Sequence, residues 1–171
     1  MSANLYETSV PVFLRYLGRL SELVRIAESY AAANSLDLLQ ARLAPDMLPF
    51  ERQVQVAANF ALRTCFPLAS QAVPPYGDFP ATFEGLQSGI SRVKTLLLSL
   101  QASQFASAEA RVIQDGASQA MVSLPGAEFL SQYALPNFYF HLVTAYAILR
   151  NQGVPLGKEH FDGFHSYPAT I

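Results

Sequence analysis

The chain has 171 residues, of which 51% are hydrophobic and 14% are charged, and its formal net charge is -2. This composition predicts one packed domain spanning residues 1–171 and argues against a disordered chain. The 11 basic residues form no run, which argues against nucleic acid as a partner. No run of 18 apolar residues occurs, so we expect no helix that spans a membrane.

The N-terminal segment MSANLYETSVPVFLRYL lacks the basic start and the continuous apolar stretch of a secretory signal. The single cysteine, Cys65, excludes an internal disulfide and a cysteine-based metal cluster, and we expect it to be inert packing. These features favour a cytoplasmic protein.

Two helices are predicted in the first half of the chain. Over residues 6–33, apolar residues recur at steps of three and four, as on the buried face of a packed helix: Val10, Phe13, Leu17, Leu20, Val24 and Ala27. Pro11 suits this helix if Thr8 or Ser9 caps it, and should bend the helix otherwise. Residues 50–66 repeat the pattern with Phe50, Val54, Ala57, Ala61 and Cys65, and Pro67 should end this second helix.

The second half of the chain predicts two more helices, over residues 81–100 and 126–152, on the same spacing. Between them, residues 101–124 form a long crossover, which we expect to hold two short strands around a hairpin turn at Asp115–Gly116. Gly153 is a typical residue to end the last helix. Phe161 and Phe164 predict that the C-terminal tail packs back onto the helices. Together these elements predict an all-α four-helix bundle with one long crossover.

The fourth predicted helix carries two polar residues on its apolar side. At about 100° per residue, His141 lies near the middle of that side and Asn137 lies one turn earlier. Pro136 has no N–H, so the carbonyl of Gln132 loses its helical partner. Buried polar groups must pair, so we expect these groups to bond to each other, to Gln53 on the second helix, to water or to a ligand.

Two interpretations of these residues are open. In the first, Asn137 and Gln53 line a ligand pocket inside the bundle. His141 is then the general acid or base, because imidazole titrates near working pH. In the second, His141 is structural, and its hydrogen bond to Asn137 or Gln53 fixes the register of the helices.

Asp46 lies in the sequence APDM, just before the second predicted helix. It either caps a short turn before Pro49 or, as a second catalytic candidate, pairs with His141 and orients the imidazole. We expect Arg42 and Glu51 nearby to be solvated or ion-paired surface groups.

Two segments, ARLAPDMLPFERQVQVA and ALPNFYFHLVTAYAILRNQGVPLGK, resemble an uncharacterised family of domains of unknown function. That family is similar in fold to the DinB/YfiT-like bundles, many of which hold a divalent metal on three histidines. The resemblance aligns His141 with one of these ligands, and Asn137 and Gln53 with the other two. Amide side chains are poor ligands for zinc or nickel, so we expect no metal unless His160 or Asp46 completes the set.

The sequence has no Walker loop, no GxGxxG and no Gly-x-Ser-x-Gly motif. We therefore expect a small-molecule-binding protein without a cofactor. One hypothesis is a metal-independent isomerase, cyclase or hydrolase that uses His141, and another is a non-enzymatic bundle that binds a ligand or dimerises. The resemblance adds a divalent-metal-dependent DinB-like enzyme as a third. The low share of charged residues predicts exposed apolar surface and hence a homodimer.

Overall fold

The computed structural model describes residues 5–166, a mostly helical chain with one two-stranded antiparallel sheet. The long helices are α1 (Leu5–Asn34), α2 (Phe50–Leu68), α3 (Phe83–Leu98) and α5 (Leu135–Asn151). The shorter elements are a 3₁₀ turn (Ala102–Phe105), β1 (Val112–Ala117), β2 (Ala120–Pro125), α4 (Gly126–Glu128), a π-helical turn (Phe129–Ala134) and α6 (Lys158–Asp162). The first four residues of the predicted domain and the last five residues of its tail lie outside this range. Within it, no helix is long and apolar enough to cross a membrane.

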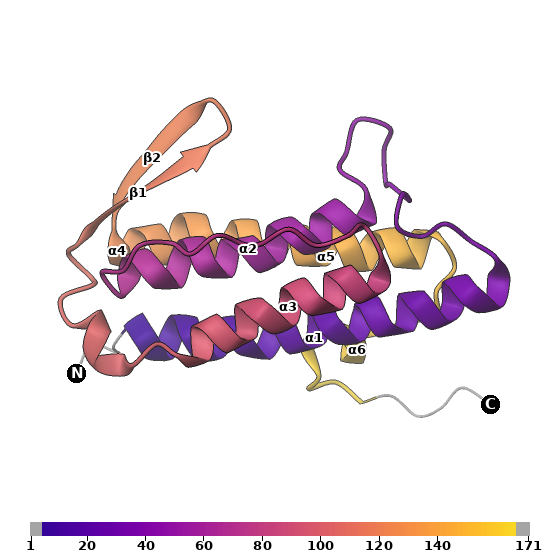
Figure 1. The fold of residues 1–171 in the computed structure, drawn as a ribbon, viewed down its shortest axis with the longest axis horizontal. Coiled ribbons are helices and arrows are strands. Elements are labelled where there is room, and N and C mark those ends of the chain that lie inside the picture. The colour runs from indigo at the N-terminus through magenta and orange to yellow at the C-terminus, as the bar shows by residue number, and fades with distance from the viewer. Residues whose placement is uncertain (1–4, 167–171) are drawn as a thin grey trace.

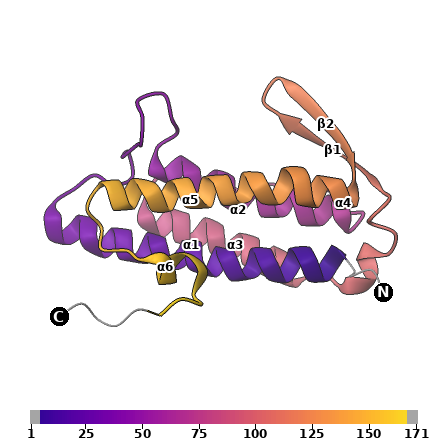
Figure 2. The same cartoon turned by 180° about the vertical axis from the view of Figure 1, so that it is seen from behind.

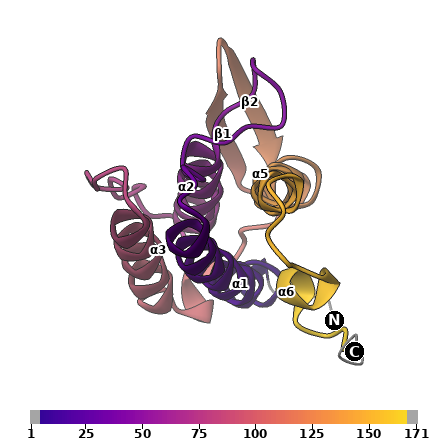
Figure 3. The same ribbon diagram turned by 90° about the vertical axis from the view of Figure 1, so that its right-hand side faces the viewer.

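The four long helices lie side by side along one axis (Figure 1). Seen end on, α3 and α5 flank the pair formed by α1 and α2 on opposite sides (Figure 3). In the view from behind, α5 lies along α2, and α6 lies against α1 (Figure 2). The β1–β2 hairpin and the loop of residues 35–49 project to the same side of the molecule, at opposite ends of α2 (Figures 1 and 3).

The core follows the apolar stripes that the sequence predicts. All the apolar residues that recur at steps of three and four in the first two helices, from Val10 to Ala27 and from Phe50 to Cys65, are fully buried. Phe13 and Phe138 meet edge to face with ring centroids 4.8 Å apart, which joins α1 to α5. Fully burying one such side chain contributes about 2–3 kcal/mol, so these stripes are the main force that holds the helices together.

The start of α1 and the end of α5 can be compared with the sequence signals that were expected to define them. Pro11 lies inside α1, because the helix already begins at Leu5, so of the two alternatives for Pro11 the earlier helix start is found and neither Thr8 nor Ser9 caps the helix. Both hydroxyls instead donate to the carbonyl of Leu5. Gly153 follows α5 with a φ of +86°, a left-handed conformation that glycine adopts without strain, so the predicted end of this helix is confirmed.

The hairpin occurs where the two short strands are predicted, but its turn does not lie at the predicted residues. Asp115 and Gly116 lie within β1, and the chain reverses at Ser118–Gln119, where Ser118 has a φ of +56°. The reason is a tertiary contact with α2. Arg63 donates to the two carboxylate oxygens of Asp115, at 3.0 and 2.7 Å, and to the carbonyl of Gly116 at 2.5 Å.

The tail packs against α1 as predicted, as far as Phe164. The ring of Phe161 lies 5.5 Å from that of Tyr16, and the guanidinium of Arg15 lies 3.7 Å from the ring centre of Phe164. Asp162 organises the segment that follows α6. Its carboxylate accepts a hydrogen bond from the N–H of Phe164 at 2.8 Å, and this bond is the largest factor that lowers the pKa of Asp162 to about 2.

Candidate functional site

His141 of α5 and Gln53 of α2 meet at the interface between the two helices. The Nδ1 atom of His141 lies 2.7 Å from the Oε1 atom of Gln53. The Nε2 atom of Gln53 donates to the carbonyl of Leu48 at 3.1 Å. Gln53 is only 1% exposed, so both of its polar atoms are paired inside the fold. The predicted proximity of His141 and Gln53 is thus confirmed.

This chain of contacts assigns the tautomer of His141. An amide oxygen only accepts hydrogen bonds, so the Nδ1 atom of His141 must be the donor and carry the proton. The Nε2 atom then holds an unprotonated lone pair, and no residue between 5 and 166 hydrogen-bonds to it. Burial lowers the pKa of His141 below its ordinary value of 6.5, so the ring is neutral at pH 7. Its Nε2 atom is free to accept a proton or a hydrogen bond.

Aromatic rings form the apolar surroundings of this imidazole. Phe60 of α2 stacks on it with ring centroids 5.9 Å apart and an interplanar angle of 25°. Phe140 meets it edge on, with centroids 5.2 Å apart. His141 is half-buried and Phe140 is 56% exposed, so the imidazole lies at the rim of the helix interface rather than in a closed core. A ligand can therefore approach from solvent while the ring stays partly desolvated.

Asn137 bonds to the backbone rather than to His141. Its Nδ2 atom donates to the carbonyl of Tyr133 at 2.7 Å. That carbonyl belongs to the π-helical turn, which ends at Ala134, two residues before Pro136, a residue with no N–H to donate. The amide thus stabilises the junction between this turn and α5. Its Oδ1 atom remains as an acceptor one turn from His141.

Asp46 and Glu51 differ from what their sequence positions suggest. Asp46 is exposed in the loop of residues 35–49, and no hydrogen bond or ion pair in the described chain joins it to His141. The alternative in which Asp46 pairs with His141 is not seen in the described chain, where Gln53 is the hydrogen-bond partner of the Nδ1 atom. Glu51 is 9% exposed, and its carboxylate accepts a hydrogen bond from Gln40 at 3.0 Å. The expectation of a surface glutamate is wrong, because this loop folds back over the first turn of α2.

A second polar cluster, absent from the sequence-based candidates, adjoins Phe60. The Arg63–Asp115 ion pair is largely shielded from solvent, with the two side chains 25% and 12% exposed. The hydroxyl of Tyr133 interacts with both partners, and its pKa is raised, first by burial and then by the Asp115 carboxylate. The ring centroids of Phe60 and Tyr133 are 6.0 Å apart. Because Phe60 also stacks on His141, it connects the imidazole to this cluster beside the hairpin. No local spacing relates Arg63 to Asp115, so the sequence carried no signal for this cluster.

The donors around His141 do not fit the three-ligand metal site that the family resemblance implies. Both polar atoms of Gln53 are engaged, and Asn137 offers only an amide oxygen. His160 lies in α6, where its Nδ1 atom bonds to Gly157, and His165 pairs with Asp162 in the tail. Among the residues that the structure describes, no group of three or more His, Cys, Asp or Glu side chains could hold a metal ion. The side chains around His141 therefore do not suit a zinc or nickel ion.

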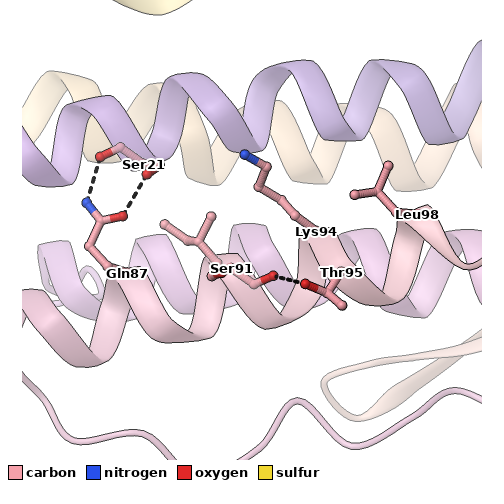
Figure 4. A pocket seen from close by; sticks show the side chains of 7 residues that line it. Ser21, Gln87, Ser91, Lys94, Thr95 and Leu98 are labelled. Carbon is pink, nitrogen blue, oxygen red and sulfur yellow. Dashed lines mark hydrogen bonds between the residues drawn. The ribbon is translucent and has the colours of Figure 1, made fainter.

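Two cavities lie apart from His141. One, with a volume of about 410 Å³, opens between α1 and α3 (Figure 4). The other, of about 110 Å³, lies between α2 and the segment around Tyr76. Neither is lined by His141, Asn137 or Gln53, so these cavities are not the pocket expected around His141.

Comparison with known proteins bears on both fold and family. A family model described as a domain of unknown function (DUF1993) matches residues 5–162. The crystal structure of a DinB family member protein from Shewanella denitrificans is 35% identical in sequence, with a TM-score of 0.85. That similarity covers 97% of this chain and 96% of the other. No curated protein matches the sequence.

Proposed function

The chain belongs to the DUF1993 family of domains of unknown function, and from this premise we propose that it is a small-molecule-binding four-helix-bundle protein. In this proposal His141 acts as a general acid or base, without a metal. Gln53 is a positioning residue, and Asn137 offers its Oδ1 atom to the ligand. The single buried cysteine agrees with a place in the cytoplasm.

The hydrogen bond between the Nδ1 atom of His141 and the Oε1 atom of Gln53, with the tautomer that it implies, supports this proposal. A neutral imidazole with a bare Nε2 atom takes a proton from an O–H, an activated C–H or a water molecule, and returns it later in the reaction. This step is common to isomerases, cyclases and hydrolases. Gln53 accepts from the Nδ1–H throughout, which keeps the ring oriented as it becomes charged. Among the described residues, no hydrogen bond or ion pair joins Asp46 to the ring, so we assign the proton transfer to His141 alone.

The tautomer can be tested directly by ¹⁵N NMR of the labelled protein. At pH 7 we expect His141 to carry a proton on Nδ1 and none on Nε2. Diethyl pyrocarbonate acylates unprotonated imidazole nitrogen, so peptide mapping should find the Nε2 atom of His141 modified in the folded protein. A small molecule that occupies the site should slow this reaction at His141 and leave His160 unaffected. A proton on Nε2, or an imidazolium at pH 7, would refute the acid–base role.

The metal-dependent alternative has its own decisive measurement. If the untagged protein as purified carried one equivalent of zinc, nickel or iron, and lost it in His141→Ala, the metal-free proposal would be wrong. We expect well under one equivalent by elemental analysis, because only His141 among the three aligned positions offers a nitrogen lone pair.

A homodimer formed through α5 is a second proposal, favoured by the composition of that helix. Phe140 and Val143 are 56% and 45% exposed and lie three residues apart on one face. Arg150, in the last turn, is the only Asp, Glu, Lys or Arg residue in α5. A helix face this apolar usually packs against protein, and two-fold symmetric pairing is the commonest way for one chain to cover it.

A further inference from the structure

We propose that the cavity between α1 and α3 binds a small molecule that carries a carboxylate or phosphate group. Its volume of about 410 Å³ lies within the range of ordinary ligand pockets, roughly 300–1,000 Å³. It is lined by Ser21 of α1 and by one side of α3 (Figure 4). Because α3 and α5 lie on opposite sides of the α1–α2 pair, this cavity is separate from His141 (Figure 3).

Lys94 gives the cavity its charge preference. Its side chain extends from α3 toward α1 (Figure 4). No ion pair or hydrogen bond joins its ammonium group to any other residue that the structure describes. None of the residues that line the cavity is acidic. Lys94 as a residue is half-buried. An ammonium group without a carboxylate partner creates a positive potential, and an oxyanion complements it.

Hydroxyl groups beside Lys94 complete an oxyanion site. Ser91 lies one turn before Lys94, and its hydroxyl makes no hydrogen bond within residues 5–166, so it can donate to a ligand. The hydroxyl of Thr95 donates to the carbonyl of Ser91 at 3.0 Å and thereby stays in place (Figure 4). An ammonium group and an O–H donor on adjacent turns match the charge and hydrogen-bonding capacity of a carboxylate or phosphate.

The two ends of the cavity define the rest of the ligand. At one end, Ser21 donates to the Oε1 atom of Gln87 at 2.6 Å, and Gln87 donates to the carbonyl of Ser21 at 2.8 Å. This reciprocal pair needs no ligand and closes that end. Toward the other end, Leu98 is 69% exposed and offers apolar surface. The ligand therefore combines one anionic group with a short apolar body.

The test is an NMR titration of the ¹⁵N-labelled full chain with phenyl phosphate and, separately, with benzoate, at constant ionic strength. We expect saturable shifts of the amides of Ser91, Lys94 and Thr95 with at least one probe, and the better probe identifies the oxyanion. Lys94→Met should weaken that binding about tenfold or more, because it removes the charged partner. Arg92→Gln is the matched control: it removes the same charge from the same helix, where Arg92 bonds to the carbonyl of Pro75, and should change binding less than twofold.

A second variant tests whether binding also needs the open volume of the cavity, independently of the charge of Lys94. Ser91→Phe places a ring at the cavity while keeping Lys94, and it should also abolish saturable binding. Thermal melts establish that each variant is folded before its binding is compared. The proposal is overturned if neither probe gives saturable shifts, if Lys94→Met and Arg92→Gln weaken binding equally, or if the Ser91→Phe protein binds like the wild type.

Discussion

At the scale of single residues, Gln53 explains why an apolar helix contains a histidine. The buried amide links the carbonyl of Leu48 to the imidazole of His141, so it ties the start of α2 to the middle of α5. The Nδ1 atom of the ring is thereby held by Gln53, whereas the Nε2 atom is available for proton transfer. The structural and catalytic interpretations of His141 are therefore compatible, and a substitution must separate them.

Two substitutions at His141 make that separation. His141→Ala leaves the buried Oε1 atom of Gln53 without a donor, which should destabilise the protein by about 1–3 kcal/mol. His141→Asn keeps an N–H donor near the position of Nδ1 and should restore much of that loss, but it has no equivalent of the Nε2 lone pair. Urea melts measure both, with ligand binding or activity as the second readout. If the Asn variant is as unstable as the Ala variant, the bond to Gln53 is not what stabilises this contact.

The lowered pKa of His141 also predicts how stability changes with pH. The unfolded chain takes up a proton at the ordinary pKa of about 6.5, whereas the folded ring stays neutral to lower pH because it is partly buried. The free energy of unfolding should therefore fall as pH drops from about 6.5 toward the folded pKa, and this group should contribute no slope well above pH 7. Urea melts at a series of pH values test this in the wild type and in His141→Asn. A slope that persists unchanged in the variant would assign it to another group.

At the scale of elements, local periodicity and tertiary contacts differ in what a sequence reveals. The stripes from Val10 to Ala27 and from Phe50 to Cys65 predict buried helix faces, because every third or fourth residue meets the same neighbour. The turn at Asp115–Gly116 was predicted from a local preference, and the contact with Arg63, 52 residues away in sequence, overrides it. The burial of Glu51 and the cluster around Tyr133 also depend on contacts between separate parts of the chain, so they could not be predicted from local sequence patterns. His141 and Gln53 could be paired from sequence because both lie on or beside an apolar helix face and because the family resemblance places both at one site.

The hairpin should depend strongly on its link to α2. Asp115→Asn removes the charge that Arg63 binds with two hydrogen bonds. Because solvent still reaches the two side chains, which are 25% and 12% exposed, we expect about 1 kcal/mol of global destabilisation, but clearly faster amide hydrogen exchange in β1 and β2. Gln114→Ala, at the exposed neighbouring position in β1, is the control and should leave exchange unchanged. Equal protection of the hairpin in the wild type and in Asp115→Asn would show that strand pairing alone holds it.

At the scale of the whole molecule, the two proposed sites lie on different sides of the α1–α2 pair. The side of α5 carries His141, the hairpin and the loop of residues 35–49, and its exposed surface includes Phe140, which borders the imidazole (Figures 1 and 3). The side of α3 carries the cavity at Lys94. A dimer formed through α5 would bury Phe140 and Val143 on the first side and leave the second side open, so oligomerisation and ligand binding at Lys94 should be independent.

The assembly itself gives the last prediction. Light scattering at tens of micromolar should give the mass of a dimer, because two copies of the α5 face can bury Phe140 and Val143 against each other. Phe140→Asp places a charge in that interface and should yield a monomer, whereas Leu98→Asp, on α3 and even more exposed, should not. Since Phe140 contacts His141, the monomeric variant should also react faster with diethyl pyrocarbonate at His141. A monomeric wild type, or dissociation by both substitutions alike, would exclude α5 as the interface.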